Sequence, residues 1–162
     1  ATRRNIVEAV NPRVKPLNYL NNILAKIEVN KAGLGEGIML HENGLVCEAT
    51  VDNIFIVKGD RFVTPPAYLG ALEGITRNTI FQMADELGIE VKEKRITRDE
   101  VYVADEAFFT GTAAEVTPIR EVDNRKIGIG KRGPITEKLQ SMYFDQVHGR
   151  RSVHPEWQTL VK

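Results

Sequence analysis

The amino-acid sequence predicts an α+β domain with a mixed, largely antiparallel sheet and flanking helices. Two apolar stretches reverse direction at Asn43-Gly44 and at Gly59-Asp60, dipeptides that commonly close β-hairpins. Residues 75–87 and 134–147 instead carry apolar side chains at helical spacing. Because strand-like segments outnumber helical ones and occur in mixed order with them, we expect antiparallel pairing to dominate.

Length and composition indicate one principal globular domain. Hydrophobic residues make up 42% of the 162-residue chain and charged residues 27%, which argues against a disordered protein. The 22 basic residues balance 22 acidic ones, so neither nucleic acid nor an anionic membrane is an expected partner. The single cysteine, Cys47, cannot form an internal disulfide, and no apolar run is long enough to span a membrane, so we expect a cytoplasmic location. The three histidines are too scattered to suggest a metal site.

Residues 1–47 predict a short extended segment, a helix and a hairpin. The extended segment covers 6–10 and ends at Asn11-Pro12. Apolar side chains at helical spacing then predict an amphipathic helix that stops at Gly33: Leu17, Leu20, Ile23, Leu24 and Ile27. In the hairpin formed by 37–41 and 45–47, both residues of the Asn43-Gly44 turn are expected to take positive φ.

The middle of the chain predicts a second hairpin, a helix and an edge strand. Residues 53–58 pair with 61–64, and Pro65-Pro66 ends the pairing. The helix over 75–87 ends at Gly88, in the left-handed conformation that glycine favours. Residues 89–94 then alternate apolar and charged side chains as an edge strand does.

The last third of the chain continues this mixed order. Thr97-Arg98-Asp99-Glu100 matches a capping box for a short helix. Strands are expected over 107–110 and 116–122, around a turn of small residues at 111–114. Gly128–Gly133 has the glycine spacing of a dinucleotide fingerprint but lacks the strand–helix–strand context, so we interpret it as a loop before the final helix.

Two charged residues stand where chemistry is plausible. Lys15 lies between Val14 and Pro16, and burial lowers the pKa of a lysine and frees a nucleophilic amine. A surface lysine whose stem covers apolar neighbours is the alternative. Glu48 follows an apolar strand, and a buried carboxylate needs a positive partner, which a protonated pyridine nitrogen or an arginine can supply.

Two backbone features could bind anions. Gly74-Ile75-Thr76 opens a helix, and the free N–H groups of a helix start bind phosphate readily; ordinary capping by Thr76 is the alternative. The turn at Gly111–Ala114 consists of small residues, so its backbone can approach a ligand closely, unless it serves as a simple chain reversal.

These features combine in a longer pattern. It consists of Lys15 with Leu17–Asn22, then Glu48–Arg77, then Thr110–Glu115. The pattern closely resembles the fold-type IV, pyridoxal-phosphate-dependent aminotransferases, most nearly the branched-chain amino acid aminotransferases. The middle stretch matches the class signature at each fixed position: Glu48, Asn53-Ile54-Phe55, Phe62-x-Thr64 and Leu72-x-Gly74-Ile75-x-Arg77.

The resemblance also implies a domain organisation. Residues 1–10 would end an interdomain segment, 11–148 would form the large, C-terminal cofactor-binding domain with its barrel-like α+β fold, and 149–162 would be a tail. The resemblance further implies that the smaller N-terminal domain of such enzymes is not covered by this sequence. Because the sequence starts without Met and soon enters a strand-like pattern, processing of a longer protein and removal of disordered first residues both stay open.

Pyridoxal 5'-phosphate is the cofactor that the resemblance implies. Lys15 would form the Schiff base and carry the catalytic proton, while Glu48 would keep the pyridine nitrogen protonated. Tyr19 would contact the phenolic oxygen and the substrate, and Leu72 the ring face. The remaining implied contacts are Gly74, Ile75, Thr76, Gly111 and Thr112 for the phosphate, and Thr112 and Ala113 for the substrate carboxylate.

The implied activity is transfer of the amino group of leucine, isoleucine or valine to 2-oxoglutarate by a homo-oligomer. D-amino acid transaminase and aminodeoxychorismate lyase share the Lys15 and Glu48 equivalents and stay open. So does an inactive fragment or cofactor-binding module, which the abrupt start of the chain favours. Ala49 and Val51 replace glycines that are common in the family, which indicates either an altered pocket or a neutral packing change.

Overall fold

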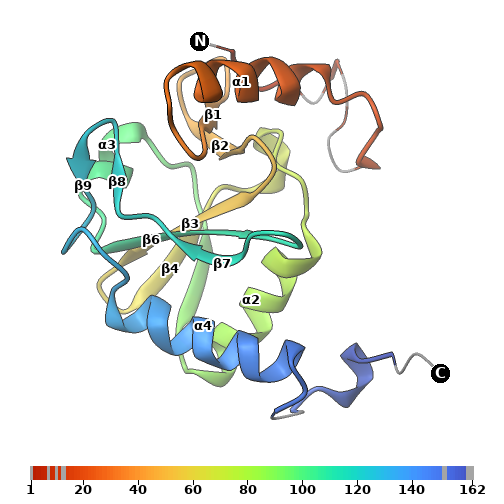
Figure 1. The fold of residues 1–162 in the computed structure, drawn as a ribbon, viewed down its shortest axis with the longest axis vertical. Coiled ribbons are helices and arrows are strands. Elements are labelled where there is room, and N and C mark those ends of the chain that lie inside the picture. The colour runs from red at the N-terminus through yellow and green to blue at the C-terminus, as the bar shows by residue number, and fades with distance from the viewer. Residues whose placement is uncertain (1, 7, 10, 12–13, 151–152, 160–162) are drawn as a thin grey trace.

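The fold is centred on a five-stranded sheet with the order β5-β4-β3-β6-β7 (Figure 1). The computed structural model describes residues 2–6, 8–9, 11, 14–150 and 153–159. The strands are β3 (Asn53–Lys58), β4 (Arg61–Thr64), β5 (Glu90–Glu93), β6 (Glu106–Gly111) and β7 (Glu115–Pro118). Neighbouring strands pair antiparallel, except that β4 and the edge strand β5 are parallel. This mixed, largely antiparallel sheet confirms the predicted α+β class and both the 53–64 hairpin and the edge strand.

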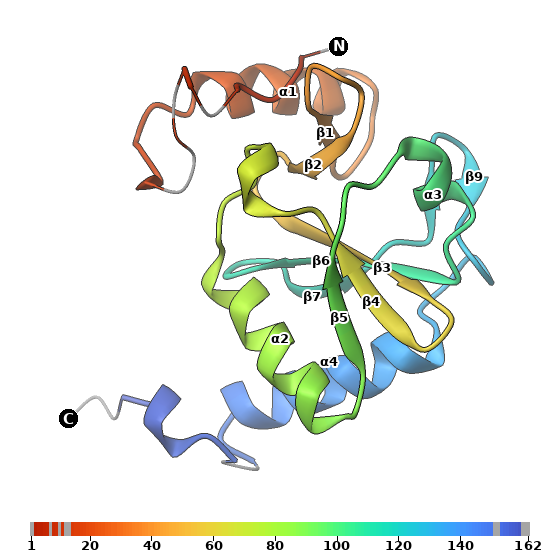
Figure 2. The ribbon, with the colours of Figure 1, turned by 180° about the vertical axis from the view of Figure 1, so that it is seen from behind.

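Apolar clusters cover both faces of the sheet. Side chains alternate along β3, so that Ile54 and Ile56 join one cluster while Phe55 and Val57 join the other. Helices α2 (Ile75–Glu86) and α4 (Pro134–Val147) pack on the face of Phe55 (Figures 1 and 2). There, the rings of Phe55 and Phe108 stack with their centroids 5.2 Å apart. Both helices match their predicted ranges to within one residue.

Helix α4 is joined to the sheet by a buried carboxylate. The side chain of Glu106, on β6, accepts hydrogen bonds from the backbone N–H of Ile135 at 3.0 Å and of Thr136 at 2.7 Å. A carboxylate at the N-terminus of a helix accepts hydrogen bonds from N–H groups that have no partner within the helix. Its negative charge also interacts favourably with the helix dipole. Gly133 permits the approach, because a Cβ there would lie 2.2 Å from Cδ of Glu106. The loop over 128–133 therefore helps to seat α4 against the sheet.

The first predicted hairpin is confirmed, but its turn differs from the expectation. Strands β1 (Ile38–Leu40) and β2 (Val46–Ala49) pair antiparallel. Gly44 has a φ of 81°, whereas Asn43 does not take positive φ. The predicted two-residue turn with positive φ at both positions is therefore wrong. The longer turn closes with the N–H of His41 donating to the carbonyl of Leu45, an arrangement that needs just one left-handed residue.

The strand predicted over 116–122 is interrupted. β7 ends at Pro118, and the chain then forms a separate small hairpin from β8 (Glu121–Val122) and β9 (Arg125–Lys126). Asp123 and Asn124 form its two-residue turn with φ angles of 50° and 60°. These are the two residue types, after glycine, that adopt this conformation most readily.

Helix α1 (Leu20–Lys31) forms as predicted but presents its apolar stripe outward. Four apolar side chains at helical spacing are exposed: Leu20, Ile23, Leu24 and Ile27. The buried positions are instead Ala25 and Val29, and Val29 packs so closely that a Cβ on Gly37 would lie 2.4 Å from its Cγ2. The periodicity predicted the helix correctly, but the stripe is not packed against the sheet.

The remaining elements are short. Thr97 and Glu100 form the predicted capping box at the start of α3 (Arg98–Tyr102). Single 3₁₀ turns occupy Ala67–Leu69 (η2) and Pro155–Trp157 (η3). The extended segment predicted over 6–10 is not a strand where it is described: residues 8–9 form a turn, and residues 7 and 10 lie outside the described ranges. Within those ranges, no helix has the length and apolar character needed to cross a bilayer.

The segment 153–158 is bound to the body of the domain through His154. Its ring contacts the carboxylates of Glu86, on α2, and Glu156, and stacks on the ring of Trp157 with centroids 3.7 Å apart. Gln146, on α4, binds the same segment through its side-chain amide. Its Oε1 accepts from the backbone N–H groups of Val153 and His154, and its Nε2 donates to the carbonyl of His154. The hydrogen bond to Glu86, followed by that to Glu156, raises the pKa of His154 above its ordinary value of 6.5.

We expect this attachment to weaken as the pH rises. A group whose pKa is raised by folding stabilises the folded form below its unfolded pKa and loses that effect as the pH passes the folded pKa. Trp157 is the single tryptophan of the chain, so its fluorescence reports on the contact directly. Fluorescence should increase through a midpoint above 6.5, and Glu86→Gln should move that midpoint downward. An unchanged midpoint in Glu86→Gln, or a titration that persists in His154→Gln, would contradict this assignment.

Candidate functional site

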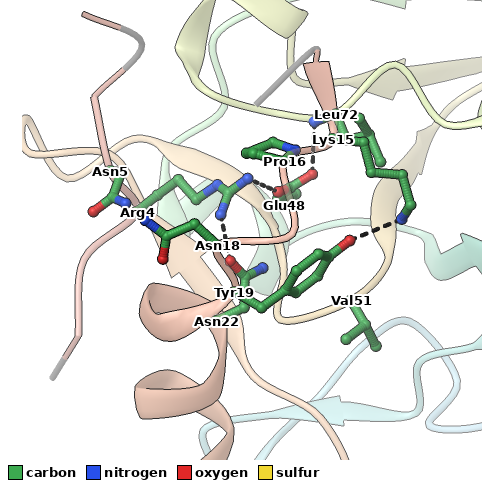
Figure 3. A pocket seen from close by; sticks show the side chains of 10 residues that line it. All are labelled: Arg4, Asn5, Lys15, Pro16, Asn18, Tyr19, Asn22, Glu48, Val51 and Leu72. Carbon is green, nitrogen blue, oxygen red and sulfur yellow. Dashed lines mark hydrogen bonds and ion pairs between the residues drawn. The ribbon is translucent and has the colours of Figure 1, made fainter. Parts of the chain in front are cut away.

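A cavity of about 190 Å³ lies where the start of α1, the loop after β2 and the segment before α2 meet the N-terminal residues (Figure 3). It is lined by Arg4, Asn5, Lys15, Pro16, Asn18, Tyr19, Asn22, Glu48, Val51 and Leu72. Four residues to which the resemblance assigns a role therefore come together: Lys15, Tyr19, Glu48 and Leu72. They derive from three separate parts of the chain, which the fold alone brings together.

Lys15 and Tyr19 are placed by the start of α1. Tyr19 is the N-cap of the helix, and its hydroxyl oxygen accepts a hydrogen bond from Nζ of Lys15 at 2.8 Å. Lys15 has a φ of 49°, a conformation that is uncommon for a residue with a side chain and that tends to occur at functional sites. The amine is exposed in this chain, so the burial considered from the sequence is not observed.

Glu48 is a buried carboxylate held by several donors. It belongs to β2 and is 5% exposed. Its Oε1 lies 2.7 Å from Nη2 of Arg4, while its Oε2 accepts the backbone N–H of Leu72 at 2.8 Å. Burial raises the pKa of Glu48, and Arg4 and the Leu72 N–H act in the opposite direction. Of the two partners that the sequence left open, an arginine is therefore present.

Arg4 is itself fixed in place. Its Nε donates to the carbonyl of Gly70 at 2.9 Å, and its Nη1 donates to Oδ1 of Asn22, on α1, at 2.7 Å. The guanidinium thus connects the N-terminal segment, α1 and the loop after η2 around Glu48. The sequence pattern does not point to Arg4, because no spacing rule links an arginine to a carboxylate so far along the chain, and it assigns no role to Asn22.

Asn53 links Glu48 to the start of α2. Its Nδ2 donates to the carbonyl of Leu72 at 2.8 Å and lies 3.5 Å from Oε2 of Glu48. A Cβ on Gly74 would lie 2.4 Å from Oδ1 of Asn53, so glycine is needed for this contact. Gly74 is the N-cap of α2 and provides no capping side chain. Capping by Thr76, the alternative considered from the sequence, is therefore not observed, since Thr76 lies within the helix.

The turn at Gly111–Ala114 lies at the same end of the sheet. Asn53 pairs with Thr110 across β3 and β6, which places the start of β3 beside this turn. A Cβ on Gly111 would lie 2.2 Å from Oδ1 of Asp52, so that the turn packs against the loop after β2. Six residues assigned to phosphate or substrate nonetheless lie outside the lining of the cavity: Gly74, Ile75, Thr76, Gly111, Thr112 and Ala113.

Two substitutions noted in the sequence have different surroundings. Ala49 is fully buried in β2, whereas Val51 is exposed and lines the cavity.

The Gly128–Gly133 loop packs on β6 residues and their neighbours, since a Cβ on Gly128 would lie 1.9 Å from the carbonyl oxygen of Asp105. This loop is not among the residues that line the cavity. Across the described residues, no three His, Cys, Asp or Glu side chains are grouped to hold a metal ion.

The cavity thus combines an accessible primary amine, a phenol and a buried anion. An amine can add to the carbonyl carbon of a ligand, and a buried carboxylate can stabilise a cationic group opposite it. Asn53 connects this carboxylate to the start of α2. The N-terminus of that helix has no capping side chain, so its free N–H groups favour an anion. A ligand with an aldehyde, a cationic ring nitrogen and a phosphate matches this set of groups.

Comparison with known proteins agrees with this chemistry. The family model described as "Amino-transferase class IV" matches residues 1–122. The chain therefore belongs to the class IV aminotransferase family.

Within the family, the relatives include branched-chain enzymes. A branched-chain-amino-acid aminotransferase of Pseudomonas aeruginosa is 59% identical over 144 residues, which cover 89% of this chain and 47% of that protein. A putative branched-chain-amino-acid aminotransferase of Methanocaldococcus jannaschii is 49% identical over 145 residues, or 90% and 50% of the two chains. The chain thus spans about half the length of the curated relatives that it matches.

Solved structures show the same correspondence. The branched-chain amino acid aminotransferase of Thermobaculum terrenum, solved in its PLP-form, superposes with a TM-score of 0.94 at 39% identity, over 98% of this chain and 52% of that chain. The enzyme of Thermoproteus uzoniensis with norvaline gives a TM-score of 0.93 at 45% identity, over 98% and 53%. The predicted family and the predicted fold are thereby confirmed.

Proposed function

We propose that this chain forms the cofactor-binding part of a pyridoxal-phosphate-dependent branched-chain amino acid aminotransferase. The observation that carries the proposal is the convergence of Lys15, Tyr19 and Glu48 on one cavity. In that assignment, residues 11–148 are the large domain of the enzyme, preceded by the end of an interdomain segment and followed by a tail over 149–162. The reaction moves the amino group of leucine, isoleucine or valine to 2-oxoglutarate.

The residues present fit pyridoxal 5'-phosphate. Glu48 is buried and ionisable, as a partner for a pyridinium nitrogen must be, and Leu72 offers an apolar surface beside it. Gly74 leaves the first N–H groups of α2 without a capping side chain, so Ile75 and Thr76 are available to a phosphate. The cofactor, when bound, supplies an electron sink for the carbanion formed at the substrate Cα.

The chain's own groups then have separate tasks. Nζ of Lys15 would hold the cofactor covalently through its aldehyde carbon, with loss of water, and as a free amine it would carry the proton to and from the substrate Cα. Tyr19 orients the Lys15 amine, because its hydroxyl oxygen accepts a hydrogen bond from Nζ of Lys15. Glu48 would stabilise a protonated ring nitrogen, and Arg4 fixes the position of the carboxylate.

The turn after β6 is assigned to anionic groups of substrate and cofactor. Backbone N–H groups at Thr112 and Ala113 would bind the substrate carboxylate, and Gly111 and Thr112 would bind the phosphate together with the start of α2. Small side chains allow a ligand to approach this backbone. The cavity of about 190 Å³ is smaller than the roughly 300–1,000 Å³ of most ligand pockets, and the residues assigned to the anionic groups lie outside its lining.

The proposed assembly is a homo-oligomer that also contains the smaller N-terminal domain. The exposed stripe of Leu20, Ile23, Leu24 and Ile27 supports a protein contact at this helix, since contiguous exposed apolar surface commonly marks an interface. The proposed location is the cytoplasm. Cys47 agrees with a reducing setting, because it is buried as a free thiol that donates to the carbonyl of Leu69.

Amino transfer by the complete protein tests the function. Protein loaded with pyridoxal 5'-phosphate should convert leucine, isoleucine and valine to their 2-oxo acids while 2-oxoglutarate becomes glutamate. D-alanine and aminodeoxychorismate serve as competing substrates in parallel reactions. Preference for either of these over the branched-chain amino acids would assign the site to another reaction, and a loaded protein that converts none would contradict the proposal.

A further inference from the structure

Val51 is an exposed apolar side chain on an otherwise buried stretch. Its side chain lines the cavity and the residue is 65% exposed, whereas the preceding Ala49 and Thr50 are each fully buried. Isolated exposed valines are common on protein surfaces and need no explanation. Val51 differs from them because it stands in a cavity that also contains Lys15 and Tyr19.

The backbone on both sides of Val51 is anchored. The N–H of Thr50 donates to Oε1 of Glu36 at 3.0 Å, and the carbonyl of Thr50 accepts from Nδ2 of Asn22 at 2.6 Å. The N–H of Ala49 donates to the carbonyl of Asp52 at 2.7 Å, closing the turn that contains Val51. A β-branched side chain on a fixed backbone has few rotamers. The two methyl groups of Val51 are therefore held in a narrow range of positions.

The methyl groups lie on the wall of the cavity that also contains the Lys15 amine. Figure 3 shows Val51 on the side of the Tyr19 ring and the Lys15 amine, away from Arg4 and Asn5. A ligand held at Nζ of Lys15 therefore occupies the cavity that Val51 also lines. A rigid apolar side chain at this position sterically excludes bulky groups of a ligand and offers no hydrogen bond to polar ones.

We propose that Val51 is a specificity-determining residue that limits the size of the amino-donor side chain accepted beside Lys15. The inference rests on the proposed aminotransferase function and adds a residue that selects among its substrates. Ala49 has no part in it, since its side chain is enclosed in the core. The effect is steric, so the shape of residue 51 matters more than its polarity.

The test compares Val51→Ala, Val51→Gly and Val51→Thr in the complete, cofactor-loaded protein. The measured quantity is the ratio of kcat/KM for a bulky donor, phenylalanine, to that for a small one, 2-aminobutyrate. Val51→Ala should raise this ratio about tenfold, within the range of one or two methyl-sized differences in a pocket, and Val51→Gly should raise it further. Val51→Thr keeps the branched shape and should leave the ratio near that of the original protein.

A binding measurement provides the readout that does not depend on turnover. Calorimetry with the saturated acids 3-phenylpropionate and butyrate should show the same change in the ratio of dissociation constants. Val103→Ala is the matched control, because Val103 is similarly exposed but lies outside the cavity. Ratios that are unchanged in Val51→Ala and Val51→Gly would overturn the inference, as would an equal loss for both ligands.

The two proposals fail in different ways. If the loaded protein transfers no amino group, the proposed function fails, while binding of the two acids still measures the size limit. If the protein transfers amino groups normally but the ratios do not respond to residue 51, the size limit alone is wrong.

Discussion

Replacing Lys15 with alanine should lower the rate of amino transfer by roughly 10⁴-fold or more, because it removes both the nucleophile and a proton carrier whose effect alone is roughly 10²–10⁴-fold. The fold should not change. Lys15 is exposed and its amine contacts Tyr19, so the free energy of unfolding should stay within about 0.5 kcal/mol of the original protein. Single-turnover kinetics and urea unfolding measure the two quantities.

Lys31→Ala is the matched control for this variant. Lys31 is an exposed lysine at the other end of α1 and does not line the cavity. It should retain the original rate. Comparable rates in Lys15→Ala and Lys31→Ala would show that Lys15 does not take part in the reaction.

Replacing Arg4 with methionine should have the largest effect on stability. It leaves the Glu48 carboxylate buried without the cation that lies 2.7 Å away, and breaking a buried pair in this way costs about 3–5 kcal/mol. Asn22 and the carbonyl of Gly70 lose their donor as well. Urea unfolding of the complete protein without cofactor measures the difference.

The loss should depend on pH in a defined direction. Burial already raises the pKa of Glu48 above its ordinary value of 4.5, and removal of Arg4 raises it further. A carboxyl group whose pKa is raised by folding destabilises the fold increasingly as the pH rises from the unfolded pKa to the folded one. The difference between Arg4→Met and the original protein should therefore be smallest in acid and grow toward neutral pH.

Two further variants separate this effect from a general loss of packing. Arg3→Met removes the neighbouring arginine, which is exposed and whose side chain donates to the carbonyl of His41, and should be near neutral. Adding Glu48→Gln to Arg4→Met should remove most of the pH dependence, since the buried charge is then absent. A pH-independent loss in Arg4→Met would show that Arg4 acts through packing alone.

Much of the fold could be predicted because local signals agreed with the final packing. The capping box at Thr97 and the helix that begins at Pro134 depend on neighbours in the sequence, and both are observed. The hairpin at Asp123-Asn124 was missed because it lacks glycine, although both residues accept positive φ. The outward stripe of α1 could not be foreseen, since periodicity gives a face but not its direction.

The site was predictable where the chemistry is carried by a residue pattern. Lys15, Tyr19, Glu48 and Leu72 share one cavity although they are spread over 58 positions, from 15 to 72 inclusive. An arginine partner for Glu48 was one expected alternative, but Arg4 itself was not predictable, because its role comes from a tertiary contact to Glu48. The assignments of Thr76, Thr112 and Ala113 stay predictions that ligand binding must test.

The most direct test of the account is to identify the residue that carries the cofactor. The complete protein is incubated with pyridoxal 5'-phosphate, reduced with borohydride, digested and mapped by peptide mass. A single phosphopyridoxyl group should lie on the peptide containing Lys15, and none should be found in Lys15→Ala. A label on another lysine, or no label at all, would contradict this expectation.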